Sequence, residues 1–133
     1  GSSSVPQEWQ QVFNAHGGEM RETYGVPVDD IVRGIRHGVR KINIDTDLRL
    51  AGAAEFRRVA ATSKSEFDPR KFLKPAMDAM AKVCRQRFEA FGTAGHASRI
   101  KPIAMSEMAK RYASGALDPK AGPTAGKQRA AAE

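Results

Sequence analysis

Two short segments of this sequence carry residue types that can hold a phosphate. Residues 1–3, Gly-Ser-Ser, precede a predicted helix, so backbone N–H groups and hydroxyls meet a helix N-terminus, which attracts anions. Residues 43–46, Asn-Ile-Asp-Thr, stand between a predicted strand and a predicted helix. In parallel α/β folds, ligands bind at this end of a strand. The same four residues are also good helix-capping chemistry, so the sequence pattern alone leaves both interpretations open.

The elements that must position these segments are mostly helical. Apolar residues at helical spacing, with capping residues at the ends, predict helices over about 4–17, 29–38, 46–61, 68–91 and 105–114. Ser4 is the predicted N-cap of the first helix, and Thr46 or Asp47 that of the third. Asp68 is the predicted N-cap of the fourth, and Pro75 is expected to break or restart that helix, because an interior proline costs about 3 kcal/mol.

The fourth predicted helix carries a regular stripe of large apolar residues. These residues recur at spacings of three and four, so the stripe is predicted to face the core. Its members are Met77, Met80, Cys84, Phe88 and Phe91.

Residues 39–45 are predicted to form one strand, because the segment is short and carries β-branched residues at Val39, Ile42 and Ile44. A single strand cannot make a sheet, since both its edges would be unpaired. The order of helix, strand and helix therefore indicates a piece of a parallel α/β structure whose other strands lie elsewhere.

Composition restricts the classes of partner. The chain has 133 residues, 41% hydrophobic and 28% charged, as in ordinary soluble domains, and has no apolar run of the roughly 18 residues that a membrane span needs. The net charge is +7, and residues 69–133 are the basic half, but they contain no dense Lys/Arg tract. We therefore expect neither a membrane nor a nucleic acid as partner. The single cysteine, Cys84, excludes an internal disulfide and fits a reducing compartment.

Several motifs occur together in a specific order. They are residues 1–7 (GSSSVPQ), 24–27 (YGVP), 38–49 (GVRKINIDTDLR), 67–71 (FDPRK) and 91–95 (FGTAG). In this combination the chain resembles the C-terminal segment of class II, metal-dependent fructose-bisphosphate aldolases, most closely the subgroup of bacterial glycolysis and the Calvin cycle. The resemblance covers residues 1 to about 120.

The resemblance implies an α/β fold, namely the C-terminal portion of a (β/α)₈ TIM barrel plus C-terminal helices, incomplete as given. Residues 1–117 are expected to form this barrel part and its helical extension, and residues 118–133 a disordered tail. The implied activity is that of a cytoplasmic lyase, the reversible cleavage of fructose 1,6-bisphosphate to dihydroxyacetone phosphate and glyceraldehyde 3-phosphate. The implied assembly is a homo-oligomer, a dimer or a tetramer.

The implied cofactor is zinc. In the family, the last zinc-binding histidine directly precedes the Gly-Ser-Ser run, so we expect the metal ligands and the proton-transfer aspartate to lie upstream of this chain. His16, His37 and His96 match no ligand position. No catalytic residue and no metal ligand are therefore assigned here, and the segment alone is expected to be inactive.

The resemblance does assign substrate binding to this chain. The resemblance implies that the Gly-Ser-Ser run and residues 43–46 bind the dihydroxyacetone phosphate end of the substrate. It implies that Arg49 and Arg70 bind the 6-phosphate, Arg70 from a neighbouring subunit. The full set is Gly1, Ser2, Ser3, Asn43, Ile44, Asp45, Thr46, Arg49 and Arg70. Arginine suits a bisphosphate because it makes bidentate contacts, although without the resemblance both arginines would be interpreted as surface salt bridges.

Two alternatives remain at this level. A tagatose-bisphosphate aldolase shares the fold and most phosphate contacts. A non-catalytic module that binds phosphate or nucleic acid is a different class, suggested by the basic half of the chain.

Overall fold

The structure, a computed structural model, describes residues 3–118, and the regular elements in that range are all helices. They are α1 (Gln7–Ala15), α2 (Val28–Arg36), α3 (Thr46–Thr62), α4 (Pro69–Ala90), the 3₁₀ helix η1 (Ala97–Arg99) and α5 (Met105–Ala113). The chain divides into two compact units, Gly1–Ala97 and Ser98–Glu133.

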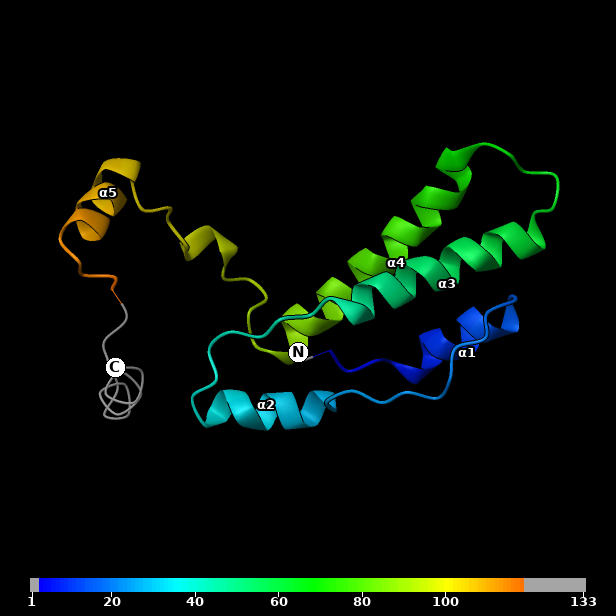
Figure 1. Ribbon diagram of the computed structural model, residues 1–133, viewed down its shortest axis with the longest axis horizontal. Coiled ribbons are helices and arrows are strands. Elements are labelled where there is room, and N and C mark those ends of the chain that lie inside the picture. Colours follow the sequence, from blue (N-terminus) through cyan, green and yellow to red (C-terminus); the bar gives the residue numbers. More distant parts are fainter. Residues whose placement is uncertain (1–2, 119–133) are drawn as a thin grey trace, which may run out of the picture. The chain divides into compact units, whose positions relative to one another are not determined.

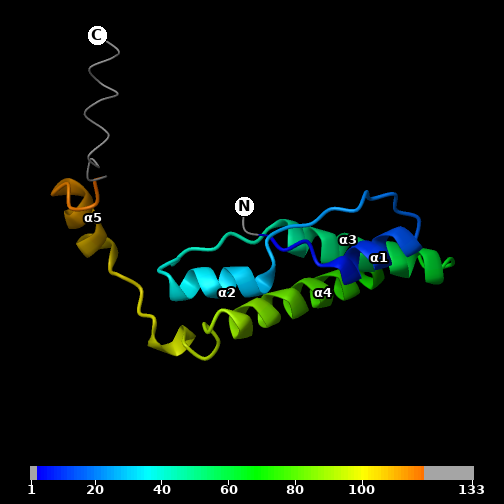
Figure 2. The ribbon, with the colours of Figure 1, turned by 90° about the horizontal axis from the view of Figure 1, so that it is seen from below.

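The first unit is built on the hairpin of α3 and α4, with α1 packed on α3 (Figures 1 and 2). Small residues form much of the α3–α4 contact, which lets the two backbones approach closely. The buried core residues are Val5, Trp9, Leu50, Ala51, Ala54, Ala79 and Val83. The core therefore joins the N-terminal segment to both long helices.

Several predicted helix ends are confirmed. Helix α3 begins at Thr46 and ends at Thr62, and α5 covers nearly the predicted range. At the start of α4, the Asp68 carboxylate accepts the N–H of Arg70 at 3.0 Å, and Pro69 is the first helical residue. A proline is favourable there because its missing N–H has no partner inside the helix.

The predictions for Ser4 and Pro75 are wrong. Helix α1 has Pro6 at its N-cap without a side-chain cap, because the Ser4 hydroxyl instead donates to the Asp47 carboxylate at 2.8 Å. Helix α4 continues through Pro75 to Ala90. The ring removes one N–H from the helix, a cost of about 3 kcal/mol, and the packing of Ala76 and neighbouring residues against α3 offsets it.

The predicted core face of α4 is also wrong. The buried residues are Ala76, Ala79 and Val83, each one position before a residue of the predicted stripe. Met77 and Phe88 are 64% and 56% exposed. Helical spacing allowed either row to face inward, and the alanines of α3 leave room for small partners rather than large ones.

Residues 39–45, the predicted strand, form no strand in the structure, so the part of the chain between residues 3 and 118 is helical rather than α/β. A strand needs a neighbour, and these residues have no second strand to pair with in that range. Burial nevertheless alternates with a period of two from residue 41 to residue 45. Ile42 and Ile44 are half-buried, whereas Lys41, Asn43 and Asp45 are exposed.

In the second unit, α5 has no buried residue. Residues 119–133, most of the predicted tail, lie outside the described residues, so the predicted boundary at 117/118 stays a prediction. Of the helices found between residues 3 and 118, none has the length and apolar content needed to cross a membrane.

Gly25 lies directly against the backbone of the N-terminal segment. A Cβ at Gly25 would stand 2.1 Å from the Ser3 carbonyl oxygen, and the next residue, Val26, donates its N–H to that oxygen at 3.0 Å. Backbone atoms cannot move aside as a flexible side chain can, so Gly25→Ala should lower the free energy of unfolding by about 1–3 kcal/mol in urea titrations.

Gly34→Ala is the matched control, since its Cβ would meet only Val39 at 3.4 Å. It replaces a glycine inside helix α2, so stability should rise by about 0.5–1 kcal/mol. Equal effects of the two substitutions would contradict the close approach at Gly25.

Candidate phosphate site at the start of helix α3

The first turn of α3 brings the two predicted phosphate segments together. The Ser3 hydroxyl oxygen accepts the N–H of Asp45 at 3.2 Å and the N–H of Thr46 at 3.1 Å. N–H groups at a helix start have no acceptor within the helix, so they need one from elsewhere. Ser3, which lies 43 positions before Thr46, provides this acceptor. We call the Ser3 hydroxyl and these two N–H groups the α3 cradle.

Arg49 stands beside the α3 cradle. Its guanidinium binds the Asp45 carboxylate through Nε at 3.0 Å and Nη2 at 2.9 Å, and the Arg49 side chain is 79% exposed. An ion pair this open to water contributes little to stability. The pair therefore leaves a guanidinium at a helix N-terminus, next to N–H donors and within reach of an incoming anion.

The residue after the cradle, Asp47, anchors the N-terminal segment. Its side chain is fully buried. Its Oδ1 accepts the Val5 N–H at 2.9 Å, and its Oδ2 accepts the Ser4 N–H at 3.2 Å and the Ser4 hydroxyl at 2.8 Å. Arg87 of α4 donates from Nη2 to the same Oδ2 at 3.1 Å. The carboxylate thus has the several donors that a buried charge requires.

These donors decide the protonation of Asp47. Burial by itself raises the pKa of a carboxyl group, because it disfavours the charged form. The hydrogen bonds from Val5, Ser4 and Arg87 stabilise the carboxylate and outweigh burial, so the pKa of Asp47 lies below its ordinary value. Asp47 is therefore ionised at neutral pH.

The remaining predicted site residues are placed differently. The Lys41 ammonium donates to the Asn43 side chain, and the Ile44 side chain lines an apolar pocket. Arg70 binds Asp68 at 2.7 Å at the start of α4, beside the end of α3, and is therefore separated from the cradle by α3, a helix of about 25 Å (Figure 1). Gly1 and Ser2 lie outside the described residues. The structure thus groups Ser3, Asp45, Thr46 and Arg49, but not Arg70.

Sequence reasoning missed the roles of Asp47 and Arg87. Asp47 precedes the buried residues Leu50, Ala51 and Ala54 at helical spacing, and Arg87 follows Val83 by four positions. That spacing could have placed both charged side chains on the core faces of their helices, facing each other.

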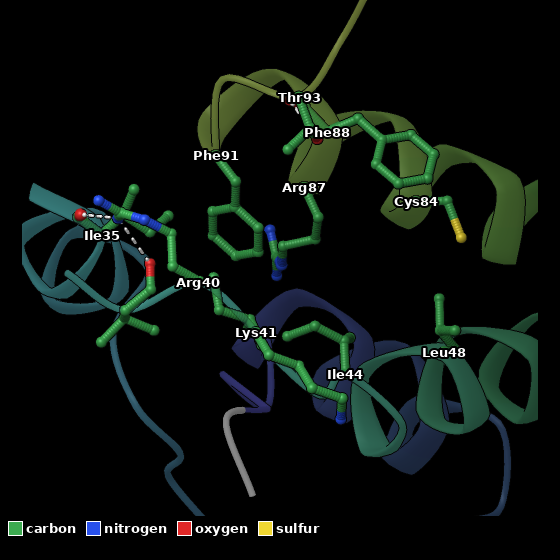
Figure 3. A pocket seen from close by; sticks show the side chains of 12 residues that line it. Ile35, Arg40, Lys41, Ile44, Leu48, Cys84, Arg87, Phe88, Phe91 and Thr93 are labelled. Atoms are coloured by element: carbon green, nitrogen blue, oxygen red, sulfur yellow. Dashed lines mark hydrogen bonds between the residues drawn. The ribbon is translucent and has the colours of Figure 1, made fainter. Parts of the chain in front are cut away.

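An apolar pocket of about 570 Å³ opens beside the cradle. It lies between residues 35–48 and the last turns of α4, and Figure 3 shows Arg87 extending from α4 alongside the Phe91 ring toward Lys41 and Ile44. Most of its lining is apolar. The lining residues are Ile35, Val39, Arg40, Lys41, Ile42, Ile44, Leu48, Cys84, Arg87, Phe88, Phe91 and Thr93.

Within residues 3–118, no three His, Cys, Asp or Glu side chains are grouped so that they could hold a metal ion. His16, for example, places Nδ1 2.8 Å from the Val12 carbonyl oxygen of its own helix. The described residues therefore do not fit a zinc site, and the expectation of upstream ligands stays a prediction.

The α3 cradle combines a helix N-terminus, a hydroxyl and a nearby guanidinium, which are groups that suit an anion. Residues 1–96 match the family described as fructose-bisphosphate aldolase class-II. The chain belongs to this class II fructose-bisphosphate aldolase family.

Curated relatives agree with this assignment. The chain is 81% identical over 121 residues to the fructose-bisphosphate aldolase of Sinorhizobium medicae (strain WSM419), which covers 91% of this chain and 34% of that protein. It is 60% identical over 120 residues to the fructose-bisphosphate aldolase of Pseudomonas aeruginosa, and the match covers 90% of this chain and 34% of that protein. It is 65% identical over 111 residues to fructose-bisphosphate aldolase 2 of Rhodobacter capsulatus, covering 84% of this chain and 97% of that sequence. The chain thus spans about a third of the length of the first two relatives.

The ionised Asp47 makes stability depend on pH. Asp47→Asn should lower the free energy of unfolding by about 3 kcal/mol at pH 7, because the amide leaves Arg87 without its anion. The folded-state pKa is depressed, so the contribution is complete above the unfolded pKa of about 4 and is lost as pH falls through the folded value. Urea unfolding at several pH values should show the two proteins converging below pH 4.

Asp78→Asn is the control, because Asp78 forms an exposed ion pair with Lys74 on the same helix as Arg87. Its effect should be small at every pH. A wild-type advantage over Asp47→Asn that stays constant from pH 7 to pH 2 would show that the carboxylate charge is not what stabilises the fold.

Proposed function

We propose that this chain is the phosphate-binding part of a class II aldolase that cleaves fructose 1,6-bisphosphate reversibly to dihydroxyacetone phosphate and glyceraldehyde 3-phosphate. The observation that carries the proposal is the α3 cradle, where the Ser3 hydroxyl meets the N–H groups of Asp45 and Thr46. Family membership supplies the substrate class, since residues 1–96 match class II aldolases.

In this proposal the chain contributes binding and orientation. The Ser3 hydroxyl oxygen keeps accepting the N–H groups of Asp45 and Thr46 and donates its proton to a phosphate oxygen, and the positive end of α3 favours the anion there. The resemblance implied that Arg49 engages the 6-phosphate. Because Arg49 lies beside the cradle, we propose instead that it exchanges its exposed pairing with Asp45 for the cradle phosphate, at little cost in stability. Fixing the phosphate holds the substrate in one orientation for the reacting groups. Gly1, Ser2, Asn43 and Ile44 are proposed to complete the substrate contacts.

The zinc of this family is proposed to be held by residues outside the described part of the chain. The described residues form no group of three His, Cys, Asp or Glu side chains that could hold it. The names of the relatives favour fructose over tagatose bisphosphate, since those of Sinorhizobium medicae and Pseudomonas aeruginosa are fructose-bisphosphate aldolases. A cytoplasmic role in glycolysis or the Calvin cycle belongs to the same proposal.

We also propose that residues 39–45 form a strand of a (β/α)₈ barrel whose other strands lie outside this chain. From residue 41 to residue 45 burial alternates with a period of two, which is the period of a strand. An apolar pocket is lined by Val39, Arg40, Lys41, Ile42 and Ile44 of this segment, and Val39 remains 44% exposed. Apolar surface of this kind is covered in a complete barrel by neighbouring strands and helices.

The position of Arg70 supports an oligomeric site. Arg70 and the cradle lie at opposite ends of α3, so one bisphosphate cannot reach both within this chain. We propose that Arg70 binds the 6-phosphate at the site of another copy in a dimer or tetramer. Its pairing with Asp68 presents the guanidinium on the surface, where a neighbouring subunit can approach it.

The first test uses a complete aldolase carrying this segment and its Ser3→Ala variant. The complete enzyme should cleave fructose 1,6-bisphosphate, lose activity with a chelator and regain it with zinc. Ser3→Ala should raise KM for the bisphosphate roughly tenfold, because one hydrogen bond to a charged group is lost. A complete enzyme that cleaves tagatose bisphosphate preferentially, or neither sugar, would overturn the proposed function.

Arg70→Ala tests the second phosphate contact. In the complete enzyme, kcat/KM for fructose 1,6-bisphosphate should fall roughly 10- to 100-fold, while inhibition by dihydroxyacetone phosphate should change little, because that ligand has no 6-phosphate. Arg33→Ala is the matched control, since Arg33 forms a comparable exposed ion pair with Asp30 on α2. Equal losses for both ligands would contradict the role of Arg70.

Mixing subunits locates the donor of Arg70. If Arg70 acts at the site of another copy, unfolding and refolding Ser3→Ala together with Arg70→Ala should yield hybrids with one fully native site. Activity should then exceed that of either variant refolded alone. Activity that stays at the average of the two would mean that Ser3 and Arg70 serve the same site from one subunit.

A further inference from the structure

We propose that Asp47 and Arg87 are positioning residues for the α3 cradle. They clamp Ser4 and Val5, and through them hold the Ser3 hydroxyl on the N–H groups of Asp45 and Thr46. This inference rests on the proposed function, because it assigns the clamp a role in binding the phosphate of the substrate. It goes beyond that function in naming two side chains that make no hydrogen bond to the cradle themselves.

The clamp acts on the residues that immediately follow Ser3. Asp47 is the second residue of α3, so its carboxylate is fixed to the same helical turn as the cradle. From there it accepts both backbone N–H groups of Ser4 and Val5, at 3.2 and 2.9 Å. The position of the N-terminal segment relative to the first turn of α3 is therefore set by one carboxylate.

Ser3 is also held from its other side. Its carbonyl oxygen accepts the Val26 N–H at 3.0 Å, so the loop before α2 fixes the peptide group that follows Ser3. With Asp47 holding Ser4, the Ser3 side chain keeps little freedom to leave the start of α3. A preorganised hydroxyl binds an anion more tightly than one that must first be ordered.

The backbone at Val5 shows that this arrangement needs to be held. Val5 has φ of +51°, in the left-handed region that β-branched residues rarely adopt. Such a conformation is unfavourable and persists only where surrounding contacts impose it. The bond from the Val5 N–H to Asp47 and the burial of Val5 in the core are such contacts. A weaker clamp would let this turn relax and move Ser3 away from the cradle.

Arg87 fixes the clamp itself. Its Nη2 donates to the Ser4 hydroxyl oxygen at 2.8 Å and to Asp47 Oδ2 at 3.1 Å, while that hydroxyl donates to the same Oδ2. The Arg87 side chain is only 12% exposed, and its Nε has no hydrogen-bond partner among the described residues. A buried guanidinium with an unsatisfied N–H is costly, so its placement is explained by what it orients rather than by stability alone.

The test separates positioning from stability in a complete aldolase carrying this segment. The variants are Arg87→Met, which removes the charge, and Arg87→Lys, which keeps the charge but lacks the planar guanidinium and its several N–H donors. Arg85→Met is the control, because Arg85 lies on the exposed side of the same helix. For each, KM and kcat for fructose 1,6-bisphosphate and competitive inhibition by inorganic phosphate are measured well below the melting temperature of that variant.

For Arg87→Met we expect KM and the inhibition constant of phosphate to rise roughly tenfold together, with kcat changing less than threefold. Arg87→Lys should recover part of both losses, since an ammonium can still donate to Asp47 and Ser4. Arg85→Met should match wild type. If Arg87→Met lowers only the melting temperature, with KM and phosphate inhibition as in wild type, the clamp is structural and the inference is wrong.

A second variant tests the clamp if the first one does not fold. If Arg87→Met does not fold, Ser4→Ala takes its place, because it removes only the hydroxyl that bridges Arg87 and Asp47. It should raise KM and the phosphate inhibition constant in parallel, and unchanged values would overturn the inference. If phosphate does not compete with the bisphosphate in wild type, the proposed function fails first. If phosphate inhibits the wild type and Arg87→Met has the same KM and phosphate inhibition constant, the clamp is refuted and the proposed function stands.

Discussion

The structure of the first unit depends on one buried charge. The Asp47 carboxylate joins three parts of the chain, the N-terminal segment, the start of α3 and the end of α4, through Ser4, Val5 and Arg87. Hydrophobic packing alone would press these parts together without fixing their register, because apolar contacts have no direction. Hydrogen bonds to a charge do have direction, so this ion pair determines where the Ser3 hydroxyl lies relative to the first turn of α3.

Sequence reasoning recovered local features well. Asp68, Pro69 and the limits of α3 follow from capping and periodicity, which act within a few residues. Composition and periodicity could not predict the contact of Ser3 with Asp45 and Thr46, because these residues are more than forty positions apart. The resemblance to class II aldolases predicted that they share one phosphate. The errors at Ser4 and Pro75 share one cause, since in both cases tertiary contacts outweighed a local preference.

The face of α4 shows why packing was harder to predict than helicity. Two apolar rows, one of small residues and one of large, run side by side along this helix, and periodicity fits both. The choice depends on the shape of the facing helix, where Ala51 and Ala54 favour small partners. The larger row is left to line the apolar pocket through Cys84, Phe88 and Phe91, beside residues 39–45. Residues 39–45 form no strand, since residues 3–118 contain no second strand to pair with them.

The long separation between Ser3 and the helix that it caps has a consequence for the order of folding. The α3–α4 hairpin needs only a short loop to close, whereas the cap requires closure of a segment of more than forty residues, and the entropic cost of closure grows with loop length. We therefore expect the local contacts of the hairpin to form before the α3 cradle. A chain that contains the helical hairpin without this long-range contact therefore lacks the α3 cradle, so helix content alone does not report its formation.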